Sequence, residues 1–203
     1  TPDCKFNIVL PANFLDTDRL NIFRLNMEYP DGGLETKRIP PKEYLQVVAA
    51  SNMKQRVRML MLYYHGELNN YAVLGTGQKN EHDQGCFVKW GDGGADLKPI
   101  AHLYKTQVYA LARALEVPED ILQRTPTTDT YSMETTQEDF YYSLPFETMD
   151  LLHYAWKLDG VDAAAAAAAM ELETEQVERV WKDFQRKEDT TEYLRLMPLH
   201  HDD

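Results

Sequence analysis

The chain has 203 residues, of which 43% are hydrophobic and 27% are charged, and this composition suits a globular protein with a sizeable core. Its net charge of −12 argues against a general nucleic-acid-binding protein, because binding to phosphates needs clustered lysine and arginine. Because the two cysteines form no metal-ligand pair or disulfide framework, and no secretion signal or long apolar segment is present, we expect a cytoplasmic protein that does not span a membrane.

The first forty residues predict a β-hairpin. Residues 6–11 and 20–29 are rich in the β-branched and aromatic residues that are typical of strands. The sequence Pro-Asp-Gly-Gly at residues 30–33 indicates a turn, and residues 34–39 then return as the hairpin partner.

A long helix and a short strand are expected next. Two prolines at 40–41 begin a helix that continues to about residue 68, with apolar residues at helical spacing: Met53, Val57, Leu60, Met61 and Tyr64. The apolar residues 70–75 predict a buried strand, parallel to its neighbours if helices connect them. Further helices are expected at 105–116, 118–124, 137–143, 146–158, 162–170 and 174–190.

Residues 76–104 form a long segment rich in Gly, Asp and Lys, and a segment of this kind inside a compact domain is usually functional. Thr76 follows the carboxyl end of a predicted strand, where open α/β sheets bind ligands. Glu81 offers a hard oxygen ligand for Mg²⁺, and Lys89 and Lys105 offer cations for phosphate. Asp96, beside glycines, can accept hydrogen bonds from a ligand close to the backbone. These residue types predict a site for a phosphate-bearing ligand with Mg²⁺.

The same residues carry a resemblance to a known family. The pattern consists of Lys54-x-Arg56-x-Arg58-Met59, Gly75-Thr76 with Glu81, Phe87-Val88-Lys89-x-Gly-Asp-Gly-Gly-Ala-Asp96, Pro99, Leu103-Tyr-Lys105-Thr-Gln107 and Pro126-Thr127-x-Asp129. In order and spacing it resembles the NAD synthetases across about residues 51–150. The resemblance implies an α/β fold of the adenine-nucleotide hydrolase-like type, an open and mostly parallel sheet flanked by helices. It also implies a homodimer.

The activity that the resemblance implies is the amidation of deamido-NAD⁺. Mg-ATP adenylates the substrate carboxylate, and ammonia then displaces AMP. Residue by residue, the resemblance implies ATP contacts at Thr76, Lys105 and Thr127, a Mg²⁺ ligand at Glu81, and deamido-NAD⁺ contacts at Arg56, Lys89 and Asp96. No catalytic nucleophile from the protein is expected, because the substrate carboxylate attacks the phosphate.

The chain also departs from the family pattern. The pyrophosphate-binding loop of the family, Ser-Gly-Gly-x-Asp-Ser, is absent from the sequence, so the chain resembles the carboxyl-terminal two-thirds of a full enzyme. We expect a partial α/β domain at 1–145 with a hairpin insertion at 6–39, and a helical extension at 146–203. Residues 193–196 read Tyr-Leu-Arg-Leu where family members often have a His-Lys pair.

Several functional alternatives remain open from the sequence. Ammonia is the direct nitrogen donor, or a separate glutaminase supplies it. The chain is an NAD synthetase, a non-catalytic nucleotide-binding relic or paralogue that lacks the pyrophosphate loop, or a related ATP-pyrophosphatase that amidates another carboxylate.

Overall fold

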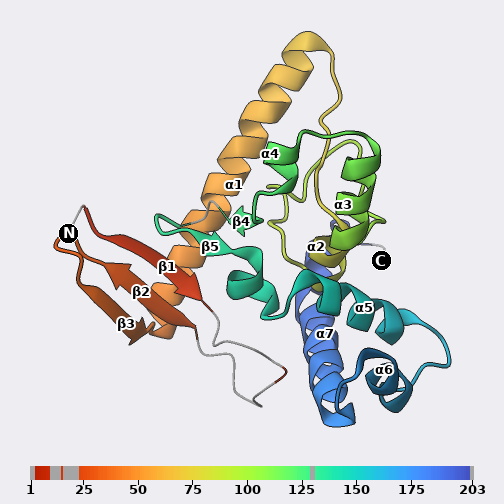
Figure 1. Ribbon diagram of the computed structural model, residues 1–203. Helices are drawn as coiled ribbons and strands as arrows, with labels where there is room; N and C mark the ends of the chain where they lie inside the picture. The colour runs from red at the N-terminus through yellow and green to blue at the C-terminus, as the bar shows by residue number, and fades with distance from the viewer. Residues whose placement is uncertain (1–2, 10–14, 16–22, 129–130, 202–203) are drawn as a thin grey trace. The chain divides into compact units, whose positions relative to one another are not determined.

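The structure is a computed structural model that describes residues 3–9, 15, 23–128 and 131–201 (Figure 1). The chain divides into two compact units, which we describe separately. Unit 1 comprises Thr1–Val47 and Ala112–Trp181, and unit 2 comprises Val48–Leu111 and Lys182–Asp203. Both units therefore use segments that lie far apart in the sequence. The expected division at residues 145/146 remains a prediction.

Unit 1 contains a three-stranded antiparallel sheet in the order β1 (Lys5–Val9), β2 (Arg24–Glu28) and β3 (Leu34–Arg38). The N–H of Gly32 donates to the carbonyl of Tyr29 over 2.9 Å, and Gly32 has a φ of +84°, which glycine adopts without strain. The predicted hairpin and its turn are thus confirmed. The outer parts of the predicted strands, residues 10–11 and 20–22, lie outside the described residues.

The remainder of unit 1 is mainly helical. Its elements are α4 (Glu119–Leu122), the two-residue strands β4 (Thr127–Thr128) and β5 (Thr135–Thr136), the π-helix η1 (Glu138–Tyr142), α5 (Phe146–Lys157), α6 (Ala163–Met170) and the first part of α7 (Thr174–Arg195). Met149, Leu152 and Val177 are fully buried in this unit. All the helices expected here are present, although the one expected at 137–143 is a single π-helical turn.

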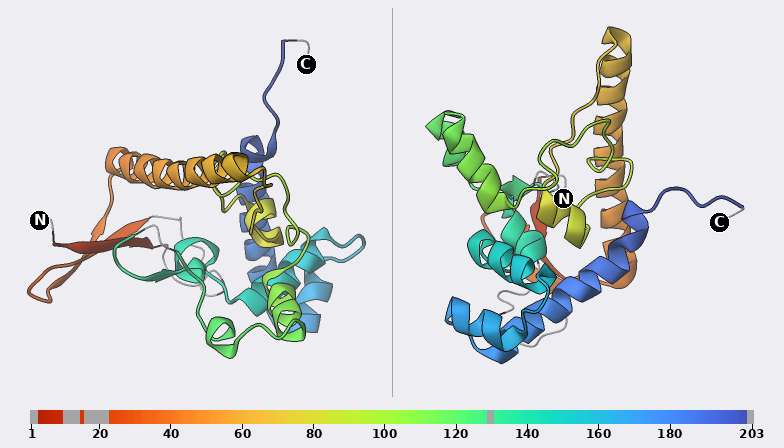
Figure 2. Two further views of the ribbon diagram at one scale, coloured as in Figure 1. Left: turned by 90° about the horizontal axis from the view of Figure 1, so that it is seen from above. Right: turned by 90° about the vertical axis from the view of Figure 1, so that its right-hand side faces the viewer.

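Unit 2 is built on α1 (Pro41–Asn69), α2 (Lys79–Gln84), α3 (Lys105–Ala114) and the end of α7, with α1 and α3 shared with unit 1. The views in Figure 2 show α1 as one uninterrupted helix. Buried apolar side chains in this unit are few: Met59, Val73, Tyr104 and Phe184. Buried polar side chains supply much of the remaining interior. None of the described helices is long and apolar enough to cross a membrane.

One face of α1 exposes its apolar side chains. The five residues that the helical spacing had singled out are 51–67% exposed: Met53, Val57, Leu60, Met61 and Tyr64. Leu68 extends the same stripe and is 67% exposed. A contiguous exposed apolar stripe of this kind usually marks an interaction site.

The prediction of a regular strand at residues 70–75 is wrong. Leu74 makes an isolated parallel bridge with Leu97, and the surrounding residues have no strand assignment. A strand is stabilised by a ladder of backbone hydrogen bonds, and in the described part of the chain only residues 96–97 offer such bonds here. Among the described residues this bridge is the one parallel pairing, so the open parallel sheet remains a prediction.

Candidate functional site

Thr76, Glu81 and Lys105 are brought together at the start of α2. Glu81 lies in the first turn of α2, and Thr76 lies two residues before the N-cap, Gln78. The backbone N–H of Lys79 donates to the carbonyl of Leu103 over 2.9 Å, which fixes the segment before α3 against the same turn. Thr76 is exposed, whereas Glu81 and Lys105 are half-buried. Three of the predicted site residues therefore belong to one local structure.

The helix α2 was not expected, because residues 76–104 were predicted as an irregular segment. Its N-terminus is a capping box in which the Gln78 side chain accepts a backbone N–H and the Gln78 N–H donates to Glu81 Oε2 over 3.0 Å. Gly85 ends the helix with a φ of +75°. The spacing Gln78-x-x-Glu81 is typical of the start of a helix, and Gly85 is typical of its end, so the sequence did contain a signal for α2. The capping box also orients the carboxylate of Glu81.

Buried amide side chains lie on α2. Gln78, Asn80 and Gln84 are at most 2% exposed, which is unusual for residues of this polarity. A Cβ atom built on Gly85 would lie 2.2 Å from Thr191 Oγ1, so α7 approaches this turn closely. These contacts make the turn that carries Glu81 a well-supported part of the unit.

Arg56 and Lys89 are also brought together. Arg56 Nε donates to the carbonyl oxygen of Lys89 over 3.1 Å. Lys89 Nζ donates to the carbonyl oxygens of Tyr193 and Leu196, each over 2.8 Å, at the end of α7. An ammonium group has three donors, and these two bonds use two of them. The contacts place the charge of Lys89 at the carboxyl end of a helix, where cations are favoured.

Asp96 joins α1 to the segment before α2. Its Oδ2 accepts the backbone N–H of Val73 over 2.8 Å, and its Oδ1 accepts the hydroxyl of Tyr63 over 3.2 Å. Desolvation, and then the hydrogen bond to Asp96, raise the pKa of Tyr63 above its usual value. Tyr63 therefore remains a donor to the carboxylate throughout the physiological pH range.

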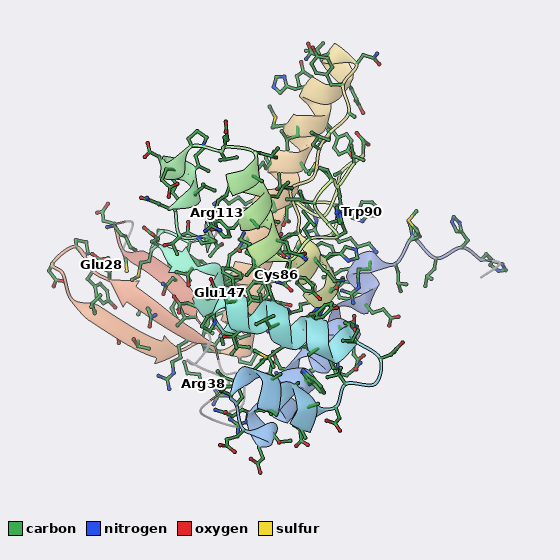
Figure 3. The ribbon with its side chains drawn as sticks, turned by 45° about the vertical axis from the view of Figure 1, so that its right-hand side comes forward. Glu28, Arg38, Cys86, Trp90, Arg113 and Glu147 are labelled. Atoms are coloured by element: carbon green, nitrogen blue, oxygen red, sulfur yellow. The ribbon has the colours of Figure 1, made fainter. Side chains whose placement is uncertain are left out.

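The segment between Phe87 and Gly94 is a series of tight turns. The N–H groups of Gly91 and Gly93 both donate to the carbonyl of Val88, over 2.9 and 3.1 Å. Trp90 has a φ of +63° and is 60% exposed (Figure 3). A Cβ on Gly93 would lie 2.3 Å from the ring of Phe87, so the chain needs glycine there. The turns hold Lys89 in an ordered backbone.

Thr127 is the one predicted site residue that belongs to unit 1. It is exposed and begins β4, where it is paired with Thr136 of β5. Asp129, the last residue of the motif, lies outside the described residues.

Arg195 is a residue that the sequence patterns did not single out. Its Nη1 donates to the carbonyl oxygens of His82 and Asp83 over 3.1 and 3.2 Å, and its Nη2 donates to the carbonyl of Glu188 over 2.7 Å. The arginine thus connects the carboxyl end of α2 to α7. In the sequence, the one feature that could have indicated a role for Arg195 is that it lies where family members often have a His-Lys pair.

Comparison with known proteins identifies the family. A family model described as NAD synthase matches residues 27–195, which is most of the chain. The chain belongs to the NAD synthase family. It is 52% identical over 190 residues to an NH(3)-dependent NAD(+) synthetase of Rhizobium meliloti, covering 94% of this chain and 57% of that protein. A second relative with the same description, from Rhizobium rhizogenes, is 53% identical over 175 residues, covering 86% of this chain and 52% of the relative.

Solved structures agree with this family membership at the level of the fold. An NMN synthetase from Francisella tularensis superposes with a TM-score of 0.58 at 24% identity, covering 76% of this chain and 56% of that one. An NH3-dependent NAD synthetase from Campylobacter jejuni gives a TM-score of 0.53 at 23% identity, covering 75% and 55%. The matches thus span a little more than half the length of these two rhizobial relatives and of these two solved structures.

The family implies a bound divalent cation, so the side chains that could act as metal ligands can be compared with this expectation. No cluster of three or more His, Cys, Asp or Glu side chains that could hold a metal occurs among the described residues. Mg²⁺ needs no such cluster, because it is usually held by one or two carboxylates together with phosphates and water. The half-buried carboxylate of Glu81 fits this requirement.

Proposed function

We propose that the whole protein is an ammonia-dependent ligase that makes NAD⁺ from deamido-NAD⁺. The observation that carries this proposal is the 52% identity to an NH(3)-dependent NAD(+) synthetase across 94% of the chain. The arrangement of Thr76, Glu81 and Lys105 around one ordered turn supports it.

The proposed chemistry has two steps. An oxygen of the substrate carboxylate bonds to the α-phosphorus of ATP while the bond to the departing pyrophosphate breaks. The nitrogen of ammonia then bonds to the carboxyl carbon, the bond to AMP breaks, and a proton leaves the nitrogen. The first step brings the substrate carboxylate up to the ATP phosphates and releases pyrophosphate, and the second step releases AMP. Fixed cations would stabilise these negative charges and so lower the barrier.

The residues around α2 would bind the nucleotide. As the resemblance to the family implies, Thr76, Lys105 and Thr127 would contact ATP, and Glu81 would hold Mg²⁺. When bound, this cation would offset the phosphate charge. Glu81 suits the role because the Gln78 N–H, 3.0 Å away, fixes one of its carboxylate oxygens. A side chain fixed in this way pays little entropy on binding a ligand.

Arg56, Lys89 and Asp96 would bind deamido-NAD⁺. The hydrogen bond from Arg56 to the carbonyl oxygen of Lys89 would hold the Arg56 guanidinium beside the backbone of Lys89. Because two donors of the Lys89 ammonium are used at α7, the third has a defined direction for an anionic or carbonyl group of the substrate. Asp96, anchored by Val73 and Tyr63, retains lone pairs that could accept a ligand hydroxyl or amide.

Two structural elements of the proposal concern the complete protein. We propose that the complete protein contains an open, mostly parallel sheet flanked by helices. We also propose that the protein is a homodimer, and the exposed apolar stripe of α1 supports this. Replacement of Leu60 by Glu would then shift the complete protein from dimer towards monomer in analytical ultracentrifugation. An unchanged sedimentation coefficient would show that this face of α1 is not the dimer interface.

The central experiment measures NAD⁺ formation by the complete protein from deamido-NAD⁺, ATP, Mg²⁺ and ammonium. We expect Glu81→Ala to abolish turnover, and the matched control Glu67→Ala, on the exposed surface of α1, to keep it. Full activity of Glu81→Ala would remove this residue from the metal site. Binding of ATP without turnover would favour a non-catalytic protein, and activity with glutamine alone would indicate a separate glutaminase.

A further inference from the structure

The sheet β1–β3 is attached to the segment that follows Thr127. The backbone N–H of Phe6 donates to Ser132 Oγ over 2.8 Å, and the N–H of Met133 donates to the carbonyl of Phe6 over 3.0 Å. The ring of Phe6 also lies 5.9 Å from the ring of Tyr131. The outer edge of β1 is therefore covered by residues 131–133, as Figure 1 shows.

A chain of side-chain hydrogen bonds runs through the sheet to β5. Thr36 Oγ1 donates to Asn26 Oδ1 over 2.8 Å, and Asn26 Nδ2 donates to Asn7 Oδ1 over 3.0 Å. Asn7 Nδ2 then donates to Thr135 Oγ1 over 2.9 Å. Asn7 is 6% exposed and Thr135 is 3% exposed, so this last bond is shielded from water, and loss of either partner removes a buried hydrogen bond.

Thr135 is in turn a direct partner of the strand that begins with Thr127. In the β4–β5 ladder Thr128 is opposite Thr135, and Thr127 is opposite Thr136. A two-stranded hairpin alone is marginally stable in water, and this ladder has two residues in each strand. The backbone position of Thr127 therefore depends on support from outside its own hairpin, and the sheet supplies it through Asn7.

We propose that the sheet β1–β3 positions Thr127 for its ligand, and that Asn7 and Thr135 are the positioning residues through which it acts. This inference depends on the proposed contact between Thr127 and ATP. The match to the NAD synthase family model begins at residue 27, within β2. The rhizobial relative covers 94% of the chain, which includes most of the sheet. In this proposal the sheet orders the segment that carries Thr127.

The test is steady-state kinetics on the complete protein, with ATP and deamido-NAD⁺ varied separately. Replacing Asn7 by Ala or Thr135 by Val removes the buried hydrogen bond between them, and we expect the KM for ATP to rise roughly tenfold. The KM for deamido-NAD⁺ should change by less than about twofold. Thr135→Ser keeps the hydroxyl and should restore the KM for ATP. Tyr29→Phe, which removes only a hydrogen bond to Glu35 on the β2–β3 hairpin, is the matched control and should have no effect.

A double-mutant cycle separates positioning from general destabilisation. If Asn7 acts through Thr127, Asn7→Ala should add less than about twofold to the KM for ATP when Thr127 is already Ala. An additive effect, or a lower melting temperature with an unchanged KM for ATP, would overturn the inference. If Thr127→Ala alone leaves the KM for ATP unchanged, the proposed ATP contact also fails. An effect of Thr127→Ala without any effect at Asn7 or Thr135 would refute this inference alone.

Discussion

Arg195 offers the sharpest test of how α7 holds the turn that carries Glu81. Arg195→Met keeps much of the apolar length of the side chain but removes its hydrogen bonds to the carbonyl oxygens of His82, Asp83 and Glu188. Hydrogen bonds to a charged group contribute about 1.5–3 kcal/mol each. The bonds to His82 and Asp83 share one nitrogen, so their energies overlap, and we expect the free energy of unfolding to fall by at least about 2–3 kcal/mol.

The assay is urea denaturation of the complete protein, combined with hydrogen exchange. The amides of Gly85 and Cys86, which donate to carbonyls of α2, should exchange at least about tenfold faster in Arg195→Met. Arg186→Met is the matched control, since Arg186 pairs with Asp183 within α7 and its side chain is 51% exposed. The control should lose less than about 1 kcal/mol. A loss below about 0.5 kcal/mol for Arg195→Met, with unchanged exchange at Gly85, would refute the reasoning.

Further predictions concern positions where the contacts are equally specific. Gly85→Ala places a Cβ in a left-handed conformation 2.2 Å from Thr191, and it should lower the free energy of unfolding by more than about 2 kcal/mol in urea denaturation. Tyr63→Phe removes a donor to Asp96, and it should cost about 1 kcal/mol in the same assay. Asp162 caps α6 by accepting the N–H of Ala165 over 2.8 Å, so Asp162→Ala should lower the melting temperature while Asp162→Ser largely retains it. Equal melting temperatures for the two Asp162 variants would contradict the capping role.

Local sequence patterns predicted those elements whose stability is itself local. The turn at residues 30–33 needs a glycine with positive φ, and Gly32 provides it. The alanines of α6 favour a helix wherever they occur. For the same reason α2 could have been predicted, because its capping box and its terminal glycine are both local signals.

The strand expected at 70–75 shows why the remainder could not be predicted. A run of apolar residues indicates that a segment is buried. Strand pairing also requires a neighbouring strand, and the local sequence does not specify which segment that is. In the described chain the N–H groups of residues 96–97 are the donors that reach Val73. The parallel bridge at Leu74 and Leu97 is the result.

Lys89 illustrates the same limit within the candidate site. Its motif identified the residue, but the groups that orient its ammonium are the carbonyls of Tyr193 and Leu196, which are 104 and 107 positions away. Those carbonyls belong to the end of α7, which was expected to stop near residue 190 and continues to Arg195. A helix shorter by one turn would leave both Lys89 and the carboxyl end of α2 without these partners. The length of α7 therefore controls the orientation of two parts of the site at once.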